Sequence, residues 1–293
     1  MHKRVMGASV CFLMLTGCGS MIVQEEAEVP PVVLTIPGST AVTTTTKPVE
    51  TTTVPLPVWD ENLEIDEENE KIVIQGVPHF TQFSQYLTAC ESLATCSLLQ
   101  YYGIDMTPDV FLDGYLPVSD YPEKDSDGEL HAEHPANAFI GDPMKGDAFG
   151  CYNSAIVRAT DKIHKGLALA HNNMSLPELC KHYIDRGEPV VIWATINMAR
   201  ASKTISWHTP GGEIYTFISP EHALVLLGYD ENNYYFCDSL QYNDICSYRK
   251  EAVEQAYEAL GEQSLVINQR VLLQVPDFWR ISNVEEMNHD DSE

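Results

Sequence analysis

The hydrophobic pattern of this chain changes character near residue 189, and this change restricts the class of fold that it can adopt. Before that point, segments of helical periodicity predominate, and several stop at a glycine, which suits the left-handed position after a helix. After it, short β-rich runs alternate with turn residues. Helices followed by a mostly antiparallel sheet predict an α+β domain. The predicted helices are Cys90–Tyr102, Thr107–Tyr115, Tyr152–His164, Ser175–Arg186 and Lys250–Leu260, and the predicted strands are Lys71–Gln75, Pro189–Ile196, Glu213–Ile218, His222–Tyr229, Tyr234–Asp238 and a region of strands over Ser264–Val275.

The folded domain is predicted to span residues 71–280. Upstream, residues 18–70 combine runs of threonine, scattered prolines and an acidic stretch from Asp60 to Glu70. Such a composition cannot bury enough apolar surface to fold, so a disordered tether is expected there. Residues 281–293 are expected to form a frayed acidic tail.

The first 17 residues have the layout of an export signal. His2, Lys3 and Arg4 form a basic head, and the apolar run that follows is too short to span a bilayer. The run Leu15-Thr16-Gly17-Cys18 resembles the lipobox of bacterial lipoproteins, which implies cleavage before Cys18 and a diacylglyceryl group on its sulfur. The alternative is an ordinary signal peptide with a chance cysteine. We expect an extracytoplasmic protein, anchored to the bacterial membrane by its lipid.

The charge of the chain excludes some partners. Lys3 and Arg4 are two of the 17 basic residues, so the chain after the signal carries 15 basic and 43 acidic side chains, a net charge of −28. Nucleic acids and anionic headgroups are bound by clusters of Lys and Arg, so this chain is expected to bind neither through its protein surface. Attachment to the membrane must then come from the lipid.

The remaining cysteines and histidines indicate no metal or organic cofactor. Six cysteines follow Cys18, enough for three disulfides in any of 15 pairings, but the domain is large enough to hold a core without them. The chain contains no Cys-x-x-Cys pair, which excludes a zinc ribbon. His131 and His134 lie three apart in a loop rich in Gly and Asp, where a solvated loop is favoured over a metal site. His208 is expected in a surface loop.

Three residues are placed for nucleophilic catalysis. Cys90 begins a predicted helix, where free N–H groups and the helix dipole favour a thiolate. His222 opens one predicted strand and Asp238 closes the next, so a hairpin would bring them to the same edge of the sheet. They share a face only if the loop has an odd length or the ladder contains a bulge.

The roles follow from the chemistry of each group. Cys90 would attack a carbonyl carbon, His222 would move the proton and Asp238 would orient the imidazole. The Gln82 side chain would donate to the oxyanion beside the Cys90 backbone N–H, with Gln85 as the alternative donor. Cys96, roughly 120° around the helix from Cys90, is expected to face the core. Cys151 is expected to line the cleft rather than form a disulfide with Cys90.

A series of short motifs lies along the predicted domain. The motifs are Val77-Pro-His-Phe-Thr-Gln82, Ala89-Cys-Glu-Ser92, Tyr101-Tyr-Gly103, Gly141-Asp-Pro143, Phe149-Gly-Cys-Tyr152 and His222-Ala-Leu-Val-Leu-Leu-Gly-Tyr229 with Asp238. Together they resemble the C39-like cysteine peptidase family, and more narrowly its exported branch with a papain-like fold. The resemblance covers nearly all of residues 71–275 and implies an α+β fold in which the cysteine lies on a central helix packed against the sheet.

Two positions depart from the family pattern. Many relatives have Gly-Cys-Gly where this chain has Ala89-Cys90-Glu91, and Ser239 stands where proline is frequent. The Glu91 carboxylate opposes ionisation of the neighbouring thiol, although it suits the first turn of a helix.

The sequence therefore predicts a cell-surface thiol hydrolase that cleaves peptide amide bonds through Cys90, His222, Asp238 and Gln82. One alternative is the same fold acting on the stem peptides or cross-bridges of peptidoglycan. Another is a binding lipoprotein in which Cys90 is inert.

Overall fold

The computed structural model describes residues 62–68 and 70–280, all of which belong to one unit, Val54–Glu293. The predicted signal peptide, Cys18, most of the predicted tether and the acidic tail lie outside the described residues. Within the described part of the chain, none of the helices has the length and apolar character needed to cross a membrane.

An eight-stranded sheet forms the centre of the domain, and all its neighbouring strands are antiparallel. Its strands run in the order β1 (Leu63–Asp66), β2 (Lys71–Ile74), β11 (Glu221–Tyr229), β8 (Val190–Thr195), β14 (Gln263–Ile267) and β7 (Ala168–Asn172), while β12 (Asn233–Cys237) pairs with β11 and β13 (Cys246–Arg249) pairs with β12. Strand β8 is buried along its whole length and β11 along most of it, which explains their nearly continuous apolar sequences.

Two small sheets lie beside this one. The first has the order β10 (Ile214–Ser219), β9 (Ser202–His208), β5 (Leu130–His131) and β4 (Glu123–Lys124). The second pairs β3 (Val118–Ser119) with β6 (Phe139–Ile140) in parallel. Trp207 of β9 and Phe217 of β10 pack with Ile140 in a separate small hydrophobic cluster.

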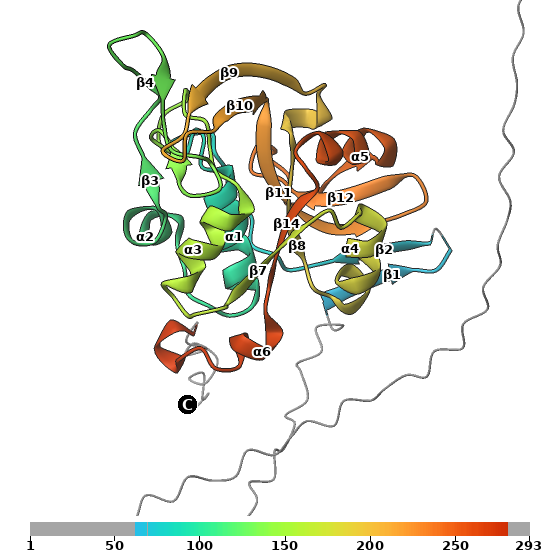
Figure 1. Cartoon of the computed structure of the whole chain (residues 1–293). Coiled ribbons are helices and arrows are strands. Elements are labelled where there is room, and N and C mark those ends of the chain that lie inside the picture. Colours follow the sequence, from blue (N-terminus) through green and yellow to red (C-terminus); the bar gives the residue numbers. More distant parts are fainter. Residues whose placement is uncertain (1–61, 69, 281–293) are drawn as a thin grey trace, which may run out of the picture. The chain divides into compact units, whose positions relative to one another are not determined.

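Helices flank the central sheet, with α1 and α3 on one side and α4 and α5 on the other (Figure 1). Helix α1 packs against β11, and all of its residues except Gln100 are buried. A helix without a polar face belongs inside a domain. The helices are α1 (Cys90–Tyr101), α2 (Pro108–Gly114), α3 (Asn153–Asp161), α4 (Leu176–His182), α5 (Lys250–Ala259) and α6 (Gln269–Leu272), with 3-10 turns η2 (Ile184–Arg186), η3 (Ile196–Met198) and η4 (Asp277–Trp279).

The predicted α+β architecture, with helices packed on a mostly antiparallel sheet, is confirmed, but two boundaries differ. Strand β1 lies inside the segment predicted to be a tether, because Leu63 packs against the core while its acidic neighbours stay on the outside of an edge strand. The strands predicted over Ser264–Val275 end at Ile267. The Asn268 side chain then accepts a hydrogen bond from Arg270 N and caps α6. Strands β3 to β7, β9 and β13 and helix α6 were not predicted.

Candidate active site

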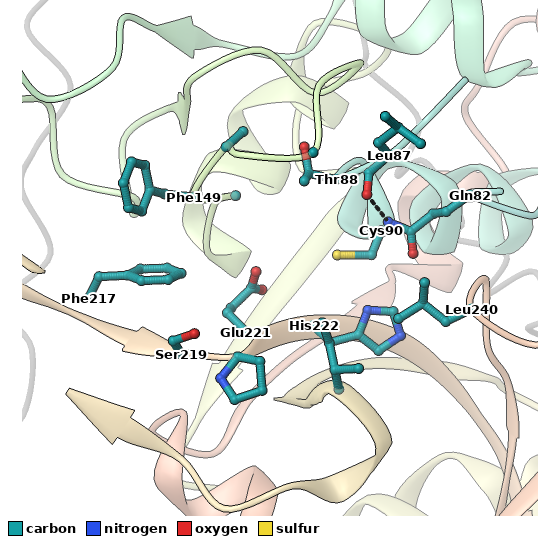
Figure 2. A pocket seen from close by; sticks show the side chains of 15 residues that line it. Gln82, Leu87, Thr88, Cys90, Phe149, Phe217, Ser219, Glu221, His222 and Leu240 are labelled. Carbon is teal, nitrogen blue, oxygen red and sulfur yellow. Dashed lines mark hydrogen bonds between the residues drawn. The ribbon is translucent and has the colours of Figure 1, made fainter. Parts of the chain in front are cut away.

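Cys90 is the first residue of α1, the helix that packs against β11. Its side chain borders a cavity of about 250 Å³ together with Gln82 and His222 (Figure 2). The segment from Gln82 to Cys90 therefore meets a distant segment, which contains His222, at this cavity. The other residues lining it are Leu87, Thr88, Gly146, Ala148, Phe149, Gly150, Ile196, Phe217, Ser219, Pro220, Glu221 and Leu240.

His222 and Asp238 form a buried pair beside Cys90. His222 Nε2 lies 2.8 Å from Asp238 Oδ1, and both side chains are 1% exposed. Because a carboxylate only accepts, Nε2 carries the proton of this bond and Nδ1 is left as the basic nitrogen. Asp238 also accepts from Leu240 N at 2.9 Å and from the Tyr248 hydroxyl at 2.8 Å. Burial alone would raise the pKa of Asp238, but His222 and these donors hold it below its usual value.

A β-bulge places the His222 and Asp238 side chains on one face. Tyr229 pairs with Tyr234 across an even loop, which by itself would leave the two side chains on opposite faces. The register shifts between Leu226 and Gly228, so that the strands beyond the shift are offset by one residue. His222 and Asp238 were expected to share a face only with an odd loop length or a bulge, and the structure contains the bulge.

Gln82 is held at both ends of its amide. Its Oε1 accepts from the Ser239 hydroxyl at 2.7 Å, and its Nε2 donates to Leu87 O at 3.3 Å. One Nε2 hydrogen is left for the cavity that Gln82 lines. Gln85, the alternative donor, is exposed and does not line this cavity.

The Cys90 thiol is hydrogen-bonded to a carboxylate rather than to the imidazole. Its Sγ donates to Glu91 Oε2 at 3.3 Å, and Figure 2 shows the sulfur directed toward the Glu221 side of the cavity. Burial raises the pKa of the thiol well above its usual value, and Glu91 and then Glu221 add to the increase. The expectation of a thiolate favoured by the helix N-terminus is therefore wrong for this arrangement, because desolvation and two nearby carboxyl groups outweigh the dipole.

Glu91 and Glu221 form a pair of buried carboxyl groups next to this thiol. Glu91 Oε1 accepts the backbone N–H of Cys151 at 2.5 Å. Burial raises the pKa of both carboxyl groups, and for Glu221 the charge of Glu91 adds to a large increase. At neutral pH we place the charge of the pair on Glu91, whose oxygens receive the hydrogen bonds, and the proton on Glu221. Gly150 leaves room for both, since a Cβ there would lie 2.5 Å from Glu91 Oε1 and 2.6 Å from Glu221 Oε2.

The other cysteines have structural positions. All six cysteines in the described residues are free, and Cys96 is fully buried in the core as predicted. Cys151 is buried, and its backbone rather than its thiol serves the site: the N–H binds Glu91, and the carbonyl accepts from Trp193 Nε1 at 2.8 Å. It supports the cavity wall and is not one of the residues that line it.

The histidines singled out in the sequence lie away from this cavity. His131 contacts Asp125 at 2.9 Å and stacks on His208, which belongs to strand β9 and not to a loop. His134 Nδ1 accepts from Ala136 N. Among the described residues, neither His131 nor His134 belongs to a group of side chains close enough to share a metal ion.

A cysteine at the start of a buried central helix, opposite a His–Asp pair on an antiparallel sheet, defines the papain-like class of α+β proteins. The model of the peptidase C39-like family matches residues 74–265, which is more than half of the chain. The chain belongs to this family.

Individual relatives agree with this assignment. The uncharacterised protein YvpB of Bacillus subtilis is 27% identical over 178 residues, covering 61% of this chain and 68% of its own length. A crystal structure from Bacillus anthracis, described as that of a candidate C39-like peptidase, is similar with a TM-score of 0.61 and 25% identity. The match covers 68% of this chain and 98% of that one.

Two residues of the site were missed in the sequence. Glu221 directly precedes His222, just as Glu91 directly follows Cys90. Its position next to a candidate catalytic residue could therefore have indicated that it belongs to the site. Tyr248 comes from β13, and no local pattern indicates that its hydroxyl reaches Asp238.

Proposed function

We propose that this protein is a thiol hydrolase that cleaves peptide amide bonds, with Cys90 as nucleophile, His222 as general base and acid, and Asp238 as the residue that orients the imidazole. The observation that carries this proposal is the buried His222–Asp238 pair, whose histidine lines the same cavity as Cys90 at the start of α1. Membership of the peptidase C39-like family supports the same chemistry.

The reaction would begin with rotation of the thiol from Glu91 toward His222. Nδ1 takes the thiol proton as Sγ bonds to the carbonyl carbon, and the electron pair of the C=O bond moves to oxygen. The Gln82 amide and the Cys90 backbone N–H stabilise this oxyanion. As the C–N bond breaks, the imidazolium returns the proton to the leaving amine. Water, activated by Nδ1, then hydrolyses the thioester and releases the thiol.

Substitution of each residue tests the role assigned to it. Cys90→Ala and His222→Ala should each abolish turnover of a peptide library, whereas Asp238→Asn should retain measurable activity because an amide oxygen can still accept from Nε2–H. Gln82→Ala should lower kcat roughly 10²- to 10³-fold, which corresponds to a loss of about 2.7–4 kcal/mol of transition-state stabilisation. Gln85→Ala is the matched control and should leave kcat unchanged. Turnover by the Cys90→Ala protein would disprove the mechanism.

A second function is favoured by one observation, the hydrogen bond that the Cys90 thiol donates to Glu91 rather than to His222. It fits a binding protein that holds a peptide in this cavity without cutting it. A peptide electrophile followed by mass spectrometry separates the two functions. A covalent adduct on Cys90 supports the hydrolase, while reversible binding of peptides with no adduct and no cleavage supports the binding protein.

We also propose that the protein is anchored at the outer face of the cell membrane through a lipid on Cys18. The support is the Leu15-Thr16-Gly17-Cys18 motif and the basic, then apolar, residues before it. Cys18→Ala should abolish labelling with radioactive palmitate, while Cys11→Ala, the control within the signal, should not. Labelling that persists in Cys18→Ala would place the lipid elsewhere.

A further inference from the structure

Three side chains with metal-binding atoms lie close together at the wall of the cavity. Cys90 Sγ and one carboxylate oxygen each from Glu91 and Glu221 all lie within 4.8 Å of one another. They come from the first turn of α1 and the first residue of β11, two elements that pack directly on each other. The positions of these three atoms are therefore set by the packing of the core and not by a mobile loop.

The Glu221 carboxyl group points to a missing ligand. Its Oε1 is buried and has no hydrogen-bond partner among the described residues, and the Glu221 residue is one of those that line the cavity. A buried carboxyl oxygen without a partner costs free energy, and such groups in native structures are normally satisfied by protein, water or an ion. A ligand that accepts electron pairs from this oxygen and from the adjacent Glu91 would remove that cost.

The spacing of the thiol and the first carboxylate fits a tetrahedral metal. Zinc binds thiolate sulfur at about 2.3 Å and carboxylate oxygen at about 2.0 Å, which places two such ligands roughly 3.5 Å apart. The distance between Cys90 Sγ and Glu91 Oε2 is 3.3 Å. A thiolate among the ligands selects Zn²⁺ or a similar thiophilic ion and disfavours Mg²⁺ and Ca²⁺, which bind oxygen.

We propose that Cys90, Glu91 and Glu221 form a binding site for a thiophilic divalent cation such as Zn²⁺. The cation takes the place of the thiol proton and of the proton held by the carboxyl pair, and its fourth coordination position faces the cavity. Two carboxylates and one thiolate carry three negative charges, so the site with a bound divalent ion has a net charge of −1.

Occupancy of this site has a consequence that rests on the proposed hydrolase function. The metal holds Cys90 Sγ on the Glu221 side of the cavity and uses the electron pair that would attack the substrate. Metal binding and catalysis then exclude each other, and Zn²⁺ is a reversible inhibitor.

The test uses Co²⁺ as a spectroscopic substitute for Zn²⁺, added to the full chain. We expect a thiolate-to-cobalt charge-transfer band that saturates at one equivalent, disappears when Zn²⁺ is added and is absent from the Cys90→Ser protein. Glu221→Gln preserves the shape of the side chain and should weaken Co²⁺ binding at least tenfold. Glu251→Gln, an exposed change on α5 with a side chain 71% exposed, is the control and should bind as the wild type does.

Cys151 provides a second control, because it too lies close to Glu91 and Glu221. Cys151→Ser should retain the charge-transfer band. A band that is lost in Cys151→Ser and kept in Cys90→Ser, or Co²⁺ affinity that is unchanged in Glu221→Gln, would overturn the proposed site. Should Glu221→Gln unfold, the comparison of wild type with Cys90→Ser still decides the outcome.

The spectrum requires no substrate, so the metal site and the hydrolase are tested separately. If Zn²⁺ is an inhibitor, it should protect Cys90 from alkylation and abolish peptide turnover. A chelator should restore both the alkylation of Cys90 and the turnover. Turnover that rises with Zn²⁺ would show that the ion activates the enzyme and would overturn the inhibitory role.

Discussion

Glu91 controls the chemistry of the residue beside it. The carboxylate accepts a hydrogen bond from the Cys90 thiol and is itself fixed by the Cys151 backbone N–H, so a negative charge is held within hydrogen-bond distance of the sulfur. Charges at this range change ionisation equilibria strongly when both groups are buried. Burial first, and then this charge, keep the thiol protonated until substrate or rotation toward His222 changes its surroundings.

This predicts the effect of removing the charge. Glu91→Gln should raise the rate of Cys90 alkylation by limiting iodoacetamide at pH 7 by roughly tenfold, since each factor of ten corresponds to about 1.4 kcal/mol of interaction. The amide can still accept from Cys151 N–H, so the helix start should stay intact. The rate at each cysteine is followed by mass spectrometry. Glu251→Gln serves as the control, and an unchanged Cys90 rate in Glu91→Gln would mean that burial alone suppresses the thiol.

At the scale of the element, strand β11 determines whether the His222–Asp238 pair exists. Its bulge brings His222 and Asp238 to one face, and its Gly228 pairs with Val73 of the neighbouring strand β2. A Cβ on Gly228 would lie 2.7 Å from Val73 Cα and 2.9 Å from Val73 Cγ2, so the close approach of the two backbones requires glycine there.

Gly228→Ala should therefore destabilise the domain. Forcing a methyl group against the β2 backbone costs roughly 1–3 kcal/mol, which lowers the melting temperature by about 2–4 °C per kcal/mol for a domain of this size. The matched control is Gly114→Ala at the end of α2, where nothing lies within 4 Å of the added Cβ. Calorimetry on both variants makes the comparison. Equal melting temperatures would show that β2 can move away without cost.

For the whole molecule, buried acidic groups make stability depend on pH. Burial and then the charge of Glu91 raise the pKa of Glu221 well above its usual value. In the unfolded chain this carboxyl ionises near about pH 4.3. Above that pH the folded state binds more protons than the unfolded state, so this contribution to stability is complete below the unfolded pKa. It is lost as the pH rises through the folded pKa.

Glu221→Gln removes this dependence. The melting temperature of the variant, relative to wild type, should increase as the pH rises above about 4.3, because only the unfolded wild-type chain is stabilised by releasing this proton. Thermal scans in the presence of a chelator measure this difference without interference from bound metal. For the control Glu251→Gln, the difference in melting temperature from wild type should not vary with pH. A constant difference for Glu221→Gln as well would show that folding does not raise the pKa of this carboxyl.

Local patterns in the sequence predicted most of the fold. Helix α1, the β11–β12 hairpin and the order of Cys90, His222 and Asp238 could be predicted, because periodicity, turn residues and motif spacing are properties of neighbouring residues. Strand β1 could not, since its acidic composition resembles that of a tether and its one packed side chain, Leu63, finds its contacts only in the assembled core. The predicted lipid anchor at Cys18 stays a prediction, based on sequence alone.

The sequence by itself determined the class of fold and the three residues proposed for catalysis, whereas only the tertiary structure decided the state of the thiol. Whether Cys90 faces an imidazole or a carboxylate depends on which side chains reach the start of α1 from β11, and on how deeply they are buried together. Adjacency in the sequence showed Glu91, but the contribution of Glu221 arises where β11 crosses the start of this helix. Desolvation and charge act through space, and this is why the raised pKa of Cys90 could not be predicted from the order of residues along the chain.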